Sequence, residues 1–217
     1  MTGLILKDFF TLKKTLIYMV VVILLFNGIY TTAGNSHFSD FFISVMVVSI
    51  LISTMSYDEY YHWDRYAAIL PVSRRQIVGA KYITAFLLFA AGSLLSLALT
   101  VGITFFQGRR YSLEDLVIFA WSILVGMIGA AVVLPCYYRF GAQKSRFLML
   151  AFYGIPSVLL VLGLRFIPGF TEKASRLEVT LEVTLEGFLL GGILLTAVAL
   201  VVSFLTSVRV LEKKELK

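Results

Sequence analysis

Six stretches of the chain are each apolar enough to cross a lipid bilayer. A spanning helix needs about 20 largely apolar residues, because the hydrocarbon core is roughly 30 Å thick. The six stretches run approximately over Leu16–Thr32, Phe41–Met55, Tyr82–Phe106, Leu116–Tyr138, Phe147–Phe166 and Phe188–Thr206. Hydrophobic residues make up 59% of the chain, and a folded chain of this size could not hide so much apolar surface from water. We therefore expect an all-α integral membrane protein, with residues 1–217 forming a single transmembrane domain of six transmembrane helices.

The basic residues lie mostly on one side of these stretches. Fourteen Lys and Arg residues lie near the two termini and in the second-to-third and fourth-to-fifth loops, and five lie on the other side. Cytoplasmic segments of membrane proteins carry such an excess, so the sequence predicts that both termini are cytoplasmic. The net charge is then +8 on the cytoplasmic side and −2 on the outer side. Topology and the attraction of anionic lipid headgroups explain the basic character, and nucleic acid is not an expected partner.

The interiors of the six stretches contain no Asp, Glu, Lys, Arg or His. Arg165, at the edge of the fifth stretch, is counted with the outer loop. Ion-coupled transporters and proton relays need such groups inside the membrane. The chain also lacks a G-x-x-x-x-G-K-[ST] nucleotide-binding motif and a hydrolase motif. We therefore expect no catalytic residue, metal or cofactor in this chain. Asn27, a strongly polar residue in the first stretch, is expected to form a helix–helix hydrogen bond.

The loop after the second stretch has an unusual composition. Residues 57–66 hold five aromatic and four charged side chains, which suits a protein interface or a helix lying at the lipid surface. Pro71 is expected to end a short helical region over residues 57–70. Ser73 and Gln76 then form an S-x-x-Q capping box, the signature of a helix start. From Arg74 a helix can run through Lys81 into the third stretch, so the sequence predicts a short surface helix joined by a firm corner to a long membrane helix.

This loop resembles the first cytoplasmic loop of short ABC type-2 transporter permeases. The residues that carry the resemblance are Asp58, Glu59, Trp63–Tyr66, Leu70–Arg74, Ile77, Val78, Lys81 and Tyr82. The opening of the chain, with Leu4–Phe10, Lys13 and Lys14, is similar to the N-terminal interfacial amphipathic helix of that family and places such a helix over residues 1–14. Within the family, the chain is most similar to small permeases of Gram-positive bacteria that export phenol-soluble modulins and other amphipathic peptides.

The resemblance implies a multi-pass permease subunit of an ATP-binding cassette exporter in the bacterial plasma membrane. It implies that two permease subunits pair, as a homodimer or heterodimer, and that each docks on a separate cytoplasmic ABC ATPase that binds ATP and Mg²⁺. It also implies that Tyr57–Tyr66 is the coupling helix that the ATPase moves. The residues expected at the ATPase interface are Asp58, Glu59, Tyr60, Trp63, Asp64, Arg65 and Tyr66, with Arg74 and Arg75 at the adjoining corner that Pro71, Ser73 and Gln76 form.

Residues 167–187 are expected on the outer side, before the last stretch. Within them, Leu177–Glu186 alternates Leu or Val with polar residues, as in a strand, whereas Glu178, Glu182 and Glu186 share one face of a helix. The short external helices of the resembling family favour the helix. Two other functions stay open: the substrate-binding subunit of an energy-coupling-factor importer, which needs a polar ligand pocket near the outer face, and an exporter for a lipid or an antibiotic.

Overall fold

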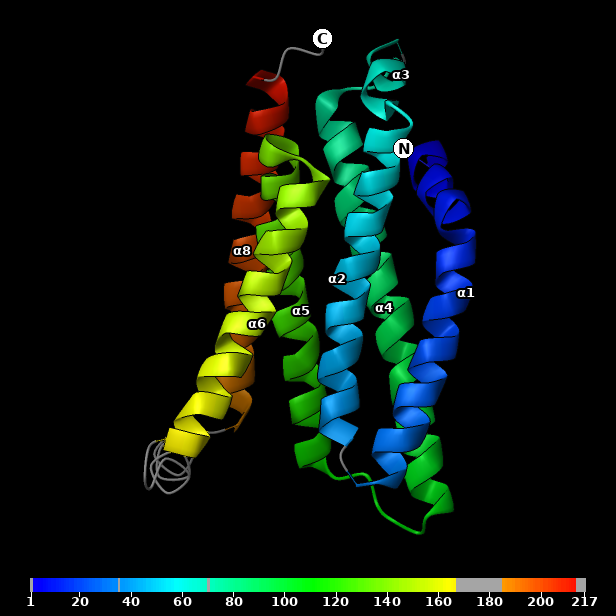
Figure 1. Ribbon diagram of the computed structural model, residues 1–217, viewed down its shortest axis with the longest axis vertical. Helices are drawn as coiled ribbons and strands as arrows, with labels where there is room; N and C mark the ends of the chain where they lie inside the picture. The colour runs from blue at the N-terminus through cyan, green and yellow to red at the C-terminus, as the bar shows by residue number, and fades with distance from the viewer. Residues whose placement is uncertain (1, 35, 70, 167–184, 214–217) are drawn as a thin grey trace.

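The computed structural model describes residues 2–34, 36–69, 71–166 and 185–213, and every structural statement below concerns this part of the chain. Its elements are all helices: α1 (Thr2–Thr32), α2 (Ser36–Tyr60), α3 (Trp63–Ile69), α4 (Arg74–Phe106), α5 (Leu113–Phe140), α6 (Ala142–Phe166) and α8 (Leu185–Lys213) (Figure 1). Six of them are long and apolar enough to span a membrane. This confirms the predicted all-α membrane fold. Residues 167–184, with most of the Leu177–Glu186 repeat, lie outside the described residues.

The helices are longer than the apolar stretches from which they were predicted. α4 has 33 residues, which at 1.5 Å per residue amounts to about 50 Å, against a hydrocarbon core of roughly 30 Å. Its extra turns lie at the end of the bundle where α1 begins, α8 ends and α3 lies (Figure 1). We call this the terminal end and the other the opposite end. The extra length allows the terminal end to project beyond the hydrocarbon core.

The first 14 residues do not form an element of their own. α1 runs without interruption from Thr2 to Thr32, which corrects the prediction of a separate interfacial helix over residues 1–14. Asp8 and Leu12 on this segment are buried, and α1 packs against α2 and α4. The first turns therefore join the helix bundle, because their polar and apolar side chains both find partners there.

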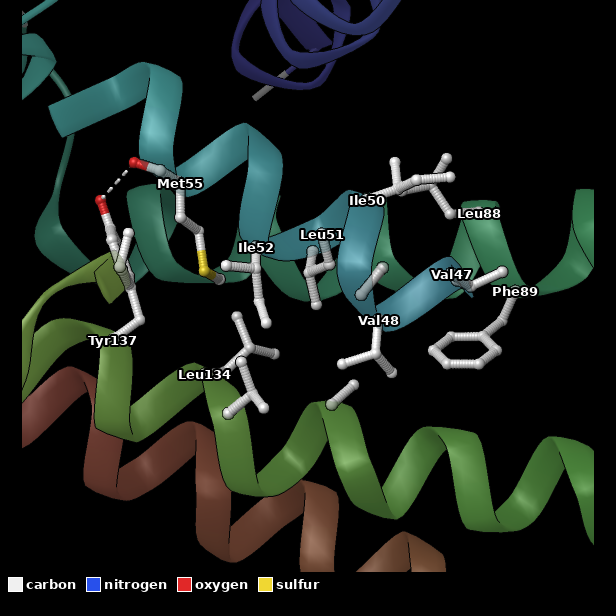
Figure 2. Close-up of a cluster of buried hydrophobic side chains, with 14 of the residues drawn as sticks. Val47, Val48, Ile50, Leu51, Ile52, Met55, Leu88, Phe89, Leu134 and Tyr137 are labelled. Carbon is white, nitrogen blue, oxygen red and sulfur yellow. Dashed lines mark hydrogen bonds between the residues drawn. The ribbon is translucent and has the colours of Figure 1, made fainter. Parts of the chain in front are cut away.

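α2 is the central helix of the bundle and packs against α1, α4, α5 and α6. Figure 2 shows its buried side chains Val47, Val48, Leu51, Ile52 and Met55 together with Leu88 and Phe89 of α4 and Leu134 of α5. In its most apolar segment 61% of the residues are buried, more than in any other described span. The second apolar stretch is short because this helix faces protein along much of its length and needs little lipid-facing surface.

Small residues allow the central helices to lie close together. A Cβ atom added to Gly126 of α5 would lie 2.6 Å from Cε1 of Phe89 and 2.8 Å from Cβ of Ser44. Both distances are shorter than carbon atoms tolerate, so glycine is required for this packing of α5 against α2 and α4.

Candidate functional site

The predicted coupling segment consists of two elements at the terminal end. α2 continues to Tyr60, so the residues from Tyr57 onward first complete its last turn. His62 has a φ of 52°, a left-handed conformation that interrupts the helix. The short helix α3 then begins at Trp63. The prediction of one helix over Tyr57–Tyr66 is corrected accordingly: the surface helix is shorter, starts later and ends at Ile69.

The corner after α3 has the predicted structure. The backbone N–H of Gln76 donates to Ser73 Oγ at 3.2 Å, and the backbone N–H of Ser73 donates to Gln76 Oε1 at 3.0 Å. These two bonds make a complete capping box. From it α4 runs through Lys81 into the membrane-spanning segment without interruption. Pro71 lies in the bend between the two helices, so the predicted joint between a surface helix and a long membrane helix is confirmed.

Four charged side chains meet beneath this corner, and we call them the charge cluster: Lys7 and Asp8 of α1, Asp58 of α2 and Lys81 of α4. The Asp58 carboxylate lies 2.6 Å from Lys7 Nζ and 2.7 Å from Lys81 Nζ. Asp8 lies 2.8 Å from Lys81 Nζ and 3.0 Å from Lys7 Nζ. Asp8, Asp58 and Lys81 are at most 7% exposed. Two acids and two bases cancel in formal charge, which is the condition for keeping ions buried.

The charge cluster is also connected to α3. Lys7 Nζ lies 4.2 Å from the centroid of the Trp63 ring, a cation–π contact at the first residue of the short helix. Lys81 Nζ also donates to Thr54 Oγ1 at 3.3 Å, and Thr84 Oγ1 donates to Asp8 Oδ2 at 3.5 Å. One buried network therefore joins α3 to the three helices α1, α2 and α4.

Several of the residues predicted to contact an ATPase have partners inside the chain. Asp58 is buried in the charge cluster, and Trp63 is half-buried against Lys7. Glu59 Oε1 accepts a hydrogen bond of 2.8 Å from the backbone N–H of Ala142, the first residue of α6. A carboxylate at a helix N-terminus is favourable both as a cap and toward the helix dipole. These three side chains hold the loop in place.

The two arginines at the corner contact the end of α8. Arg74 Nη1 donates to the carbonyl oxygens of Leu211 and Glu212 at 2.7 and 2.6 Å, where cationic side chains satisfy the last carbonyls of a helix. Arg75 Nε lies 3.9 Å from Glu212 Oε1. The structure thus places both at the corner, as predicted, and attaches the corner to the last membrane helix.

An apolar and aromatic surface remains around α3, which we call the exposed patch: Tyr60, Tyr61, Tyr66 and Ile69. These side chains are 74%, 62%, 63% and 83% exposed. Tyr60 and Tyr66 were predicted as interface residues, whereas Ile69 was not. Asp64 and Arg65 belong to α3, and their side chains lie outside the described ones.

Sequence reasoning missed Lys7, Asp8 and Lys81 as buried residues because all three lie outside the six apolar stretches, where charged side chains are expected to face water. A signal for Lys81 was present: Val78, Lys81, Ala85 and Leu88 follow one another at intervals of three and four, the spacing of one helix face. Val78, Ala85 and Leu88 are buried, so a lysine within this row had to be buried too and needed an acidic partner.

The opposite end holds a second polar group of residues. Asn27 is fully buried, and its Oδ1 accepts a hydrogen bond from Thr100 Oγ1 of α4 at 2.8 Å and a longer one from Ser39 Oγ of α2 at 3.5 Å. The predicted helix–helix hydrogen bond of Asn27 is confirmed. Nearby, His37 Nε2 lies 3.5 Å from Asp115 Oδ1, which connects the starts of α2 and α5.

These features define a polytopic membrane protein in which a surface helix is fastened to the membrane-spanning helices through buried charges. The sequence matches the family described as ABC-2 family transporter protein over residues 3–212, and the chain belongs to this family. It is therefore the membrane component, or permease, of an ABC transporter, and the family implies a membrane environment and a cytoplasmic ABC ATPase as partner. The comparisons with curated proteins and with solved structures found no match.

Proposed function

We propose that the chain is the permease subunit of a bacterial exporter of amphipathic peptides, and that a separate ATPase docks on the terminal end from the cytoplasm. The observation that carries the proposal is the network joining α3 to three membrane helices through the charge cluster and Trp63. A second permease subunit completes the transporter, and the plasma membrane is its location.

The network is suited to transmit movement from α3 into the bilayer. Short ion pairs with little exposure to water are stiff, because a shift of one side chain separates it from its partner in a low-dielectric environment. Lys7 contacts both the ring of Trp63 and the buried Asp58, so a displacement of α3 acts on α1 and α2 at once. Lys81 extends the same chain of contacts to α4.

The exposed patch supports docking of another protein at α3. Protein interfaces are enriched in aromatic side chains at their centre, and the binding energy concentrates in a few such residues. Tyr66 and Ile69 are exposed on α3 at the terminal end of the bundle. The excess of Lys and Arg on this side supports its assignment as the cytoplasmic side.

An apolar groove supports an amphipathic substrate. It has a volume of about 300 Å³ and lies between α4, α5 and α8, where Ile83, Phe86, Met127, Ala130 and Leu200 are among its lining residues. Such a surface matches the apolar face of an amphipathic helix and, equally, an acyl chain, so lipid export is the second candidate. An energy-coupling-factor importer fits less well, because the polar cavity near the opposite end has room for a ligand no larger than a water molecule.

Docking can be tested with two matched substitutions, Ile69→Asp in the exposed patch and Leu113→Asp at the opposite end. Both residues are 83% exposed, so the two variants add one charge at equally accessible positions. We expect Ile69→Asp to reduce copurification of the ATPase about tenfold or more, as for an interface hot spot, and Leu113→Asp to leave it unchanged. Equal copurification with both variants would remove α3 from the ATPase interface.

The substrate class can be tested in proteoliposomes that contain the permease and its ATPase. We expect ATP-dependent movement of an amphipathic helical peptide, such as a phenol-soluble modulin, and its loss when the bulkier side chain of Ala130→Phe fills the groove. Movement of a fluorescent phospholipid without movement of the peptide would replace the peptide by a lipid as substrate.

A further inference from the structure

A small polar cavity near the opposite end lies between α2, α4 and α5. Its polar lining consists of Asp40, Ser44, Ser93, Ser96 and Ser122. Two of these residues belong to α2, two to α4 and one to α5. The cavity has room for one ligand of about the size of a water molecule. The remaining lining is apolar, with Ile43, Val47 and Phe89 among it.

Asp40 brings an uncompensated carboxyl group to this cavity. It is 3% exposed, and Ser96 Oγ donates a hydrogen bond of 2.9 Å to its Oδ1. Among the residues that the structure describes, no Lys or Arg forms an ion pair with it. In the charge cluster, by contrast, each carboxylate has a lysine Nζ within 3.0 Å. A buried carboxylate without a counter-charge is costly, and a bound cation or a proton removes that cost.

The serine hydroxyls around Asp40 present oxygen lone pairs. Ser44 donates its proton to the carbonyl of Phe41 at 2.8 Å, and Ser122 donates to the carbonyl of Phe119 at 2.7 Å. Ser93 donates to the carbonyl of Ala90 at 3.2 Å. Since each hydroxyl has a single proton, the three oxygens are left as acceptors at the cavity. The lining therefore offers acceptors from three helices, and a ligand that fits it is a donor or a cation.

The charged groups at this end also favour a cation. Tyr111 lies in the loop before α5, and burial, with the nearby carboxylates of Asp40 and Asp115, raises the pKa of its hydroxyl to about 12. His37 lies 3.5 Å from Asp115 and also interacts electrostatically with Asp40, so one histidine is shared between two carboxylates. The two carboxylates outnumber the single histidine, which favours a cation over an anion at this end.

We propose that this cavity binds a single dehydrated monovalent cation of the Na⁺ class, with Asp40 supplying the charge and Ser44, Ser93 and Ser122 supplying neutral oxygen ligands. Hard oxygen ligands of this kind suit hard cations. One carboxylate balances one positive charge, and the described residues contain no group of three His, Cys, Asp or Glu side chains that could hold a metal ion, so a divalent ion fits less well. The cation would fasten α2, α4 and α5 together. This inference does not depend on the proposed function.

The test uses the purified full-length permease and Na⁺ as the probe. Binding of ²²Na⁺ is measured by scintillation proximity, and thermal unfolding is measured in NaCl and in choline chloride at equal ionic strength. We expect saturable binding of one Na⁺ per chain. A ligand that binds only the folded state stabilises it, so we expect a melting temperature about 5 °C or more higher in NaCl at saturating Na⁺.

Two variants and one control assign the effect to the cavity. Asp40→Asn should abolish both binding and the Na⁺-dependent shift. Ser122→Ala retains the carboxylate and should weaken Na⁺ binding several-fold in a protein that still folds. Glu114→Gln removes an exposed acid in the first turn of α5 and should behave like the wild type. Equal melting in both salts would overturn the proposal. A stability that changes with pH alone, and loses that dependence in Asp40→Asn, would also overturn it and identify a proton as the occupant.

Discussion

Replacing Asp58 with Asn tests whether the charge cluster stabilises the bundle as a charge-balanced unit. Asp58 neutralises Lys7 at 2.6 Å and Lys81 at 2.7 Å. The substitution keeps the size of the side chain but leaves two bases facing one acid, Asp8. Removing one partner from a buried ion pair costs about 3–5 kcal/mol, because a buried charge is left uncompensated.

The expected loss lies near the lower limit of this range. The Lys7 side chain is 23% exposed and can be hydrated in part, whereas the Lys81 side chain is 6% exposed and retains only Asp8. We expect Asp58→Asn to lower the free energy of unfolding by about 3 kcal/mol. For a chain of this length the melting temperature then falls by about 6–12 °C.

The single cysteine of the chain provides the assay. Cys136 is half-buried in α5, so a thiol-reactive fluorophore reports its exposure on heating the protein in detergent micelles. The control is a double variant, Asp58→Asn with Lys81→Met, which removes one acid and one base and so keeps the charge cluster neutral. The double variant should lose at least about 1 kcal/mol less than the two single losses added together, since residues in one network are coupled. Additive losses, or a loss below about 0.5 kcal/mol as at an ordinary surface site, would contradict the buried cluster.

Three further predictions follow from the packing, the corner and the topology. Gly126→Ala should lower the free energy of unfolding by about 1–3 kcal/mol, because the added carbon meets Phe89 and Ser44, whereas Gly102→Ala, with no atom within 4 Å, should not destabilise α4. Ser73→Ala removes the capping box and should cost about 1 kcal/mol, measured by the same thermal assay; an unchanged melting temperature would mean that the corner is not held by this cap. On a Cys136→Ala background, a cysteine at Ser36 should react with an impermeant maleimide in intact cells and one at Ser73 only after permeabilisation, and the reverse pattern would invert the predicted orientation.

Hydrophobic length and turn chemistry predicted the fold well. The apolar stretches are long enough to require spanning helices whatever their packing, and the capping box at Ser73 is a local signal that depends on two neighbouring residues. The sequence could not show that α1 is continuous from Thr2, because the pattern of a basic amphipathic segment is the same on a lipid surface and against α2 and α4. It also could not place the break at His62, because a φ of 52° is uncommon for a residue other than glycine and no local turn signal marks this position.

That the aromatic loop forms the ATPase interface stays a prediction, and the contacts of its residues inside the chain were not predicted. The aromatic loop indicated an interface, and Tyr60 and Tyr66 are indeed exposed. Asp58 was predicted on the same surface because the sequence does not reveal its buried partners. Lys7 is 51 residues away, and Lys81 lies on another helix. Such pairings depend on how the helices pack, which composition and spacing do not encode.

In the proposed mechanism, α3 drives the membrane helices through its contact with the charge cluster. The most direct test is the amount of peptide exported per ATP hydrolysed, measured in proteoliposomes with the ATPase, for the wild type and for Trp63→Ala. This variant leaves the exposed patch intact and removes the cation–π contact with Lys7, which is worth about 0.5–2 kcal/mol. We predict that the ATPase still binds and hydrolyses ATP, while export per ATP falls about tenfold, as a loss of about 1.4 kcal/mol in coupling implies. An unchanged ratio of export to hydrolysis would show that the contact between Trp63 and Lys7 does not couple α3 to the membrane helices.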